Sequence, residues 1–380
     1  MMRHEVIRTA EALHRLEPQW TELLSRSGRR ELPLTHLWVC AWWRHFGADS
    51  ELRVHCFWLD ERLVAAAPMM MTVNGRYRRV RLARESLNAN GHSPFADILL
   101  DASLSHEGLL DVLKRICESS SADIVSMIRI PLESRVSSAL TQGRGPSGRA
   151  IGLERNLRTP LVRVTGRWDD FFAAKSQKFR KGMRNKLNKF FKSPDFRVER
   201  IRLQSSAHQA LAEMIDVSRR SWKAKVGTDL ATLPGSLGFL KQLIDALGPR
   251  DCAEVWMAYR KEQPIAYELH LRYAGTTYPL RADIDEGFRD LSPGSVVEAT
   301  ALRQLFEEGA VELYDSCAND YWYLSNWTTE YREHLDIEIF GKSLRGNAVY
   351  LFEYRVVPVL RAIRDKLRKP TASAMPPASH

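Results

Sequence analysis

The chain has 380 residues, of which 44% are hydrophobic and 27% are charged, and its mean hydropathy is −0.33. This composition suits a globular protein with room for two domains, and no apolar run approaches the roughly 20 residues that span a bilayer. The N-terminus lacks the apolar core of a signal peptide, so we expect a cytoplasmic protein. The formal charge of +10 predicts an anionic partner, which the charge alone leaves open: nucleic acid, an acidic membrane surface or a phosphorylated ligand.

The first 150 residues predict a mixed α/β fold. Residues 36–46 are rich in aromatic side chains at helical spacing, residues 52–59 and 62–71 form two strands joined by a turn, and an amphipathic helix at 104–117 precedes a strand at 124–130. The stretch 137–150 is dense in Gly, Ser and polar residues, which is typical of a linker or exposed loop. We therefore expect one domain over 1–150 and a second over 151–368, with a disordered tail at 369–380.

A basic amphipathic helix is predicted near the start of the second half. Residues 175–192 contain eight basic residues and no acid, with apolar residues at helical spacing on one side. A solvated structural face usually mixes charge signs, so anion binding is a comparable interpretation. We assign Lys178, Arg180 and Arg184 to the binding of an anionic cofactor group.

Three strands at 254–259, 265–273 and 277–282 follow, separated by turn residues. In the middle strand, alternation puts Ala266, Glu268, His270 and Arg272 on one face. A carboxylate beside an imidazole on a rigid strand can serve as a general base. A solvated polar face or a structural ion pair is the alternative interpretation.

A loop then opens directly into a helix that leads to a short strand at 311–315. Ser292 can cap the helix, Pro293 suits its first position, and Gly294 lets backbone amides approach a ligand, so a phosphate-bearing cofactor is plausible at Ser292, Gly294 and Ser295. An ordinary capped helix explains the same residues. Asp315, at the end of the strand, is a further candidate catalytic residue, and the substrate pocket is predicted at Tyr278, Asp283, Tyr321, Trp322 and Tyr323.

The order of these features resembles the cellulose-biosynthesis-type acetyltransferases of the GNAT superfamily. The shared features are the tryptophans of 36–46, the basic run from Lys175, Gln263–Pro264, Leu291–Gly294 and Tyr314–Asp315, over roughly residues 5–360. The resemblance implies two tandem GNAT-like domains in an α/β fold with mixed sheets, as in Fem-type transferases. It also implies an acyl donor, acyl-CoA or acyl carrier protein, bound in the C-terminal domain. Metal-binding signatures are missing from the sequence, so we expect no metal.

These inferences predict an N-acyltransferase that acts on an amine of a lipid or saccharide envelope precursor, with N-acylation of a sphingoid base as a special case. A Fem-like aminoacyl-tRNA-dependent transferase and a non-catalytic scaffold at a membrane are the alternatives; we do not expect nucleic acid as a partner. H-E-x-x-H, P-loop, G-x-G-x-x-G and G-x-S-x-G motifs are absent, which argues against the common hydrolases and kinases. The stretch 356–369 predicts an amphipathic helix with basic residues beside an apolar side, so we also expect peripheral binding to an anionic membrane.

Overall fold

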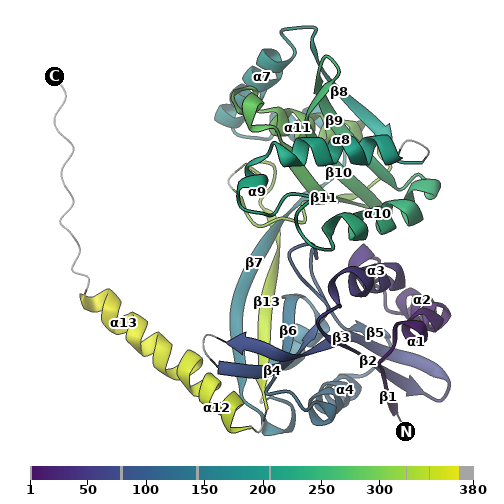
Figure 1. The fold of residues 1–380 in the computed structure, drawn as a ribbon, viewed down its shortest axis with the longest axis vertical. Helices are drawn as coiled ribbons and strands as arrows, with labels where there is room; N and C mark the ends of the chain where they lie inside the picture. Colours follow the sequence, from purple (N-terminus) through teal and green to yellow (C-terminus); the bar gives the residue numbers. More distant parts are fainter. Residues whose placement is uncertain are drawn as a thin grey trace.

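The computed structural model describes residues 2–77, 80–142, 145–204, 207–321, 323–341 and 343–367. The tail predicted at 369–380 lies outside these residues. A single mixed sheet runs through both halves of the chain, with the strand order β1-β2-β3-β4-β6-β13-β7-β12-β11-β10-β9-β8 and β5 paired to β3 (Figure 1). Helices cover both faces of this sheet.

The first half supplies the strands β1 (Arg3–Ile7), β2 (Glu51–Leu59), β3 (Arg62–Tyr77), β4 (Val80–Leu87), β5 (Leu99–Leu100) and β6 (Ile124–Pro131). Its helices are α1 (Ala10–Arg15), α2 (Glu17–Arg26), α3 (His36–Phe46), α4 (His106–Ser119) and α5 (Arg135–Thr141). Each strand and helix predicted before residue 131 is thus present. The stretch 137–150 is not a loop throughout, because its first residues belong to α5 and Ser137, Ala139 and Leu140 are buried.

The second half supplies the strands β7 (Ile151–Arg163), β8 (Phe196–Arg202), β9 (Ala253–Arg260), β10 (Gln263–Tyr273), β11 (Thr276–Ile284), β12 (Leu313–Asp315) and β13 (Glu330–Phe340). Its helices are α6 (Trp168–Ala173), α7 (Gln177–Phe190), α8 (Ala207–Arg219), α9 (Trp222–Lys225), α10 (Ser236–Leu247), α11 (Pro293–Glu308), α12 (Leu344–Leu351) and α13 (Val357–Leu367). A short 3₁₀ turn, η4 (Glu286–Leu291), precedes α11, and a π-helical turn, η5 (Phe352–Val356), joins α12 to α13.

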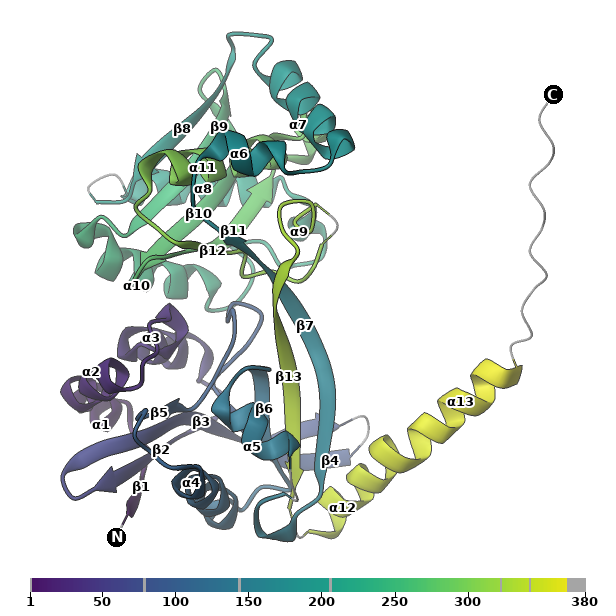
Figure 2. The ribbon, with the colours of Figure 1, turned by 180° about the vertical axis from the view of Figure 1, so that it is seen from behind.

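The long strands β7 and β13 connect the two halves (Figure 2). β13 pairs with β7 along its length and, through its second part, with β6 of the first half, whereas the end of β7 pairs with β12 of the second half. A strand from the C-terminal part of the chain therefore completes the N-terminal part of the sheet. The division after residue 150 stays a prediction, since the hydrogen-bonded sheet continues across it.

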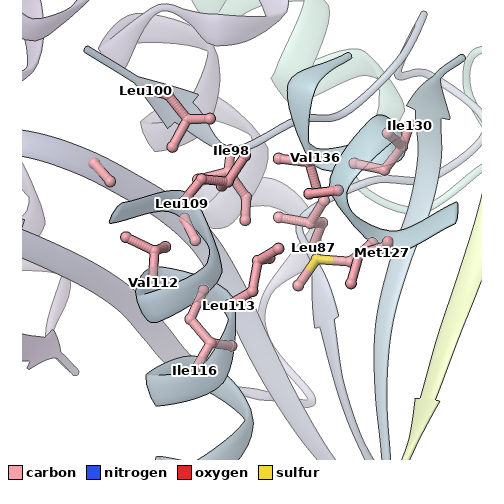
Figure 3. Packing of buried hydrophobic residues seen from close by; sticks show 14 of the residues in the cluster. Leu87, Ile98, Leu100, Leu109, Val112, Leu113, Ile116, Met127, Ile130 and Val136 are labelled. Carbon is pink, nitrogen blue, oxygen red and sulfur yellow. The ribbon is translucent and has the colours of Figure 1, made fainter. Parts of the chain in front are cut away.

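Separate hydrophobic cores lie on the two faces of the sheet. In the first half, α4 and α5 bury Leu113, Ile116 and Val136 against Met127 of β6 (Figure 3). In the second half, α8 and α10 pack on one face and α7 and α11 on the other. Helix α3 joins the halves, because Trp38 meets Phe239 of α10 edge to face at 5.0 Å. The second half is thereby held against the first by apolar burial as well as by the sheet.

All five cysteines are unpaired. Among the described residues, no helix is long and apolar enough to cross a membrane.

Candidate active site

Strand β10 presents its two faces as the sequence predicted. Tyr267, Leu269 and Leu271 point into the core under α8 and α10, and Ala266 packs with residues of α11 on the opposite face. Glu268 and His270 share that opposite face and interact directly. His270 Nε2 lies 2.7 Å from Glu268 Oε1, as a donor to the carboxylate.

Glu268 accepts a second hydrogen bond on the same oxygen. The hydroxyl of Tyr314, on β12, donates to Glu268 Oε1 at 2.7 Å. Both donors are buried, and His270 is completely enclosed, so His270 can act on a substrate only through Glu268. The two bonds fix the carboxylate through its Oε1 oxygen.

A second buried carboxyl group, Glu298 on α11, faces Glu268. Glu298 is 5% exposed. Burial, followed by the charge of Glu268, raises the pKa of Glu298 to about 8, and Trp327 and Lys186 offset only part of this effect. Two carboxyl groups in one apolar site favour holding a proton between them. A group that gains and loses its proton near neutral pH suits general acid or base chemistry.

Sequence reasoning missed Glu298, although a signal was present. Within Val296–Leu302 it is the only charged residue, and Val297, Ala301 and Leu302 around it are all buried. A lone acid on the apolar stripe of a helix is costly to bury unless it has a role or a partner. Here the partner is Glu268, on a strand whose distance in sequence hides the contact.

The start of α11 is an open helix N-terminus. Ser292 does not cap it as predicted: its backbone is left-handed, with φ of 50°, and its side chain makes no capping hydrogen bond. The first helical hydrogen bond runs from Val296 N to Ser292 O at 3.2 Å, which leaves the N–H groups of Gly294 and Ser295 ahead of it. A Cβ on Gly294 would lie 3.0 Å from Ile284 Cγ2, so a larger residue is crowded there.

Two lysines of α7 reach this N-terminus. Lys186 Nζ donates to Ser295 Oγ at 2.9 Å, and Lys189 Nζ donates to the carbonyl oxygen of Asp290 at 2.8 Å. Burial lowers the pKa of Lys186. Backbone amides, the positive end of the helix dipole and two ammonium groups thus converge on one place, which is the requirement for binding a phosphate.

The three cations selected from the sequence lie elsewhere on α7. Lys178 is exposed, Arg180 Nε donates to the carbonyl oxygen of Lys175 at 3.1 Å, and the guanidinium of Arg184 lies 5.8 Å from the centre of the Phe172 ring. Among the described contacts, those of Lys186 and Lys189 reach the start of α11. The role of Lys178, Arg180 and Arg184 stays a prediction.

Asp315 is buried in the joint between the two halves. Its carboxylate pairs with Arg332 of β13 and accepts the N–H of Cys317 at 3.1 Å. Arg332 also lies 3.4 Å from Glu133 and 5.0 Å from the centre of the Phe95 ring, both in the first half. These contacts satisfy the charge of Asp315 and indicate a structural part for it.

Two residues predicted for the substrate pocket lie on the far face of the sheet from Glu298. The Tyr278 hydroxyl accepts the N–H of Leu32 at 3.3 Å, which adds a contact between the halves. Asp283 accepts hydrogen bonds from Ser218 and Tyr267 at 2.7 Å and pairs with Lys223 at 2.6 Å. The structure therefore does not bring Tyr278 and Asp283 to the carboxyl pair.

The aromatic loop after β12 borders the carboxyl pair. Tyr321 and Tyr323 stack with ring centres 5.7 Å apart, and Trp322 lies outside the described residues. Burial, together with the negative charges of Glu298 and Tyr321, raises the pKa of Tyr323. Tyr323 is 41% exposed, so it connects the buried acids with solvent.

A cavity of about 370 Å³ lies on the other side of Trp327. Its lining includes Arg163, Arg167, Phe171, Lys175 and Glu330 as well as Trp327. Lys175 Nζ donates to the carbonyl oxygen of Trp327 at 2.5 Å and lies 3.8 Å from the centre of the Phe171 ring. Trp327 is thus shared between the cavity wall and the surroundings of Glu298. Within the part of the chain that the structure describes, no cluster of three or more His, Cys, Asp or Glu side chains could hold a metal ion.

A family model matches the part of the chain that carries these residues. Residues 177–326 match the family model described as an acetyltransferase (GNAT) domain, and this range contains Glu268, His270, Glu298 and the start of α11. No curated protein matches the sequence significantly.

Solved structures match over nearly the whole chain at low identity. FemX is 11% identical with a TM-score of 0.51, covering 93% of this chain and 100% of its own. The C-terminal domain of a putative lysylphosphatidylglycerol synthetase from Agrobacterium fabrum is 12% identical with a TM-score of 0.52, covering 91% and 97%. A conserved protein of unknown function from Bacteroides thetaiotaomicron is 12% identical with a TM-score of 0.53, covering 90% and 100%. The expected mixed α/β fold is confirmed, and residues 177–326 match an acetyltransferase (GNAT) domain.

Proposed function

We propose that this protein is an N-acyltransferase that moves an acyl group from acyl-CoA or acyl carrier protein to an amine of a lipid or saccharide precursor. The observation that carries the proposal is the buried pair Glu268 and Glu298 one turn from the open N-terminus of α11, inside the range that matches an acetyltransferase domain. This arrangement combines a phosphate site with a proton acceptor, the two requirements of thioester aminolysis.

The donor would bind with its phosphate groups at the start of α11. The N–H groups of Gly294 and Ser295 and the ammonium groups of Lys186 and Lys189 supply the positive charge. Both thioester donors named above carry a phosphopantetheine phosphate, so this site accepts either. Glu298 follows Ser295 by one turn, so a thioester running along α11 from that site would approach the carboxyl pair.

The acceptor amine would attack the thioester carbonyl carbon. A C–N bond forms, the tetrahedral intermediate collapses, the C–S bond breaks, and the thiolate departs. The proton that the amine loses passes to the Glu268–Glu298 pair. His270 and Tyr314 hold Glu268 in place, and burial together with the charge of Glu268 raises the pKa of Glu298 to about 8.

An envelope precursor is the acceptor class we favour, and the support is the likeness to FemX and to a lysylphosphatidylglycerol synthetase domain. A sphingoid base is one such amine. The aromatic side chains of Tyr321 and Tyr323, half exposed beside the acids, suit an acceptor with an apolar part.

The test measures donor binding and thiol release separately. Purified protein is titrated with acetyl-CoA, palmitoyl-CoA and an aminoacyl-tRNA, and thiol release is then followed with sphinganine or glucosamine as the amine. We expect acyl-CoA binding and amine-dependent thiol release, with Glu268→Gln losing the release and keeping the binding. Transfer from aminoacyl-tRNA alone would establish the Fem-like alternative. If no donor binds and no thiol is released, the non-catalytic scaffold is the interpretation that remains.

A further inference from the structure

The C-terminal arm, residues 344–367 with α12, η5 and α13, is anchored at one end and projects from the body at the other (Figures 1 and 2). Tyr350 and Tyr354 pack on Phe340 of β13, with ring centres 5.3 and 5.8 Å away. A Cβ on Gly152 would overlap the Tyr354 ring at 2.1 Å, so this tyrosine sits tightly against β7. The start of the arm is therefore fixed to the sheet, and Val357 is the last buried residue among the arm's described side chains.

Beyond this anchor, the arm exposes a continuous apolar stripe. Val356, Val359, Leu360 and Ile363 recur at intervals of three and four residues, so they share one helix face. They are 43%, 57%, 54% and 49% exposed. Leu344, Leu351 and Phe352 are also exposed nearer the anchor. Soluble surfaces scatter such residues singly, so a row of them marks a contact surface.

The charged residues beside this stripe indicate which kind of partner could cover it. Among the described side chains of the arm, every exposed charged residue is an arginine: Arg345, Arg355, Arg361 and Arg364. The one described acid, Glu353, is partly buried. The sequence continues with Lys366, Arg368 and Lys369 against a single acid, Asp365.

This combination fits a bilayer better than another macromolecule. A second copy of the arm would bring arginines against arginines, because its exposed charges have one sign. A nucleic acid would use the cations but not the aliphatic row, since phosphates require charge and bases require aromatic partners. An apolar face flanked by cations is what lies in the interface of an anionic membrane.

We propose that the C-terminal arm docks this protein onto an anionic lipid surface, with Val359, Leu360 and Ile363 inserted among the acyl chains and the arginines on the headgroups. Helix α7, whose Lys178, Lys181, Arg184 and Lys189 are exposed, lies on the same side of the molecule as the arm (Figure 2). The positive charges of these side chains add to the electrostatic attraction between the protein and the anionic lipid surface. This docking is independent of acyl transfer and would stand if the reaction were a different one.

The experiment is sedimentation of the full-length protein with vesicles of phosphatidylglycerol and phosphatidylcholine, against vesicles of phosphatidylcholine alone. We expect binding only to the anionic vesicles at low salt, and release at about 1 M salt, where the Debye length is about 3 Å. Two arm variants test the two components of the contact. Leu360→Ser with Ile363→Ser removes apolar area, and Arg361→Glu with Arg364→Glu reverses two charges; each should weaken binding at least about tenfold.

Leu110→Ser is the matched control, because Leu110 is an exposed leucine of a helix on the body, at 41%. It should bind vesicles as the wild type does, and all variants should keep the unfolding midpoint, since the changed side chains are already exposed. No binding to anionic vesicles, or full binding by the serine variant, overturns the proposal. A concentration-dependent dimer that the serine variant abolishes assigns the stripe to a second copy, and tRNA retention that depends on the arginines alone assigns the arm to nucleic acid.

Discussion

Replacing Glu298 by glutamine tests whether a neutral carboxylic acid is buried against Glu268. In the folded protein the pKa of Glu298 lies at about 8, against an ordinary value of 4.5. Between these values the folded state holds a proton that the unfolded state has released, so the free energy of unfolding falls as pH rises. The contribution is fully present below pH 4.5 and is lost as the pH passes through about 8.

The size of the effect follows from the change in the free energy of unfolding per pH unit. Each pH unit well below the folded-state pKa removes about 1.4 kcal/mol, and the slope falls to half at that pKa, so wild type should lose about 2 kcal/mol between pH 6 and pH 8 through this one group. Glutamine carries no charge at either pH. The difference in the free energy of unfolding between wild type and Glu298→Gln should therefore change by that amount between the two pH values. Taking the difference cancels the titrating groups that do not interact with Glu298, because both proteins share them.

Urea unfolding followed by tryptophan fluorescence at about pH 6 and pH 8 measures this difference. Glu307→Gln is the control, since Glu307 lies on the same helix with a side chain 45% exposed and should leave the pH dependence unchanged. Glu298→Gln should also remove the rise in turnover through pH 8 if Glu298 accepts the proton. Equal pH dependence in wild type and Glu298→Gln would refute the idea that the carboxyl pair holds a proton.

Three further changes probe the donor site and the base. Gly294→Val should weaken acyl-CoA binding in calorimetry at least about tenfold, whereas Gly182→Val, at a helical glycine with open space around it, should not; equal affinities would remove the α11 site. Lys186→Met should lower the affinity for acyl-CoA but not for a thioester without phosphate, and a parallel loss for both would contradict a phosphate contact. His270→Ala should lower kcat about 10²-fold with KM unchanged, because His270 is enclosed and acts only through Glu268. His270→Gln keeps a hydrogen-bond donor toward Glu268 and should restore part of kcat. Equal kcat values for His270→Ala and His270→Gln would indicate that His270 contributes by packing alone.

Local patterns in the sequence determined the elements that carry the site. Alternation along β10 placed Glu268 and His270 opposite Tyr267, and their contact at 2.7 Å confirms it. Helical spacing predicted α7 and its apolar side, and Met183 is buried there. Such patterns are readable because burial on one face repeats every two residues in a strand and every three or four in a helix.

Tertiary structure alone decided which of these elements meet. Glu298 became a site residue because α11 packs its apolar stripe on the face of β10 that carries Glu268. Tyr278 and Asp283 were assigned to the pocket from the sequence, yet the sheet turns them to the far face. The face of β11 on which each residue falls depends on its register with β10, and that register shifts between Leu269 and His270.

The pairing of β13 with β6 shows the same limit at the scale of the whole chain. Phe340 pairs with Ile124, more than 200 residues earlier in the sequence. Both strands have the alternation of ordinary strands, and nothing local distinguishes one partner from another. Sequence therefore determined the elements of this protein, whereas the joint between its halves and the acid pair arise from packing between distant segments.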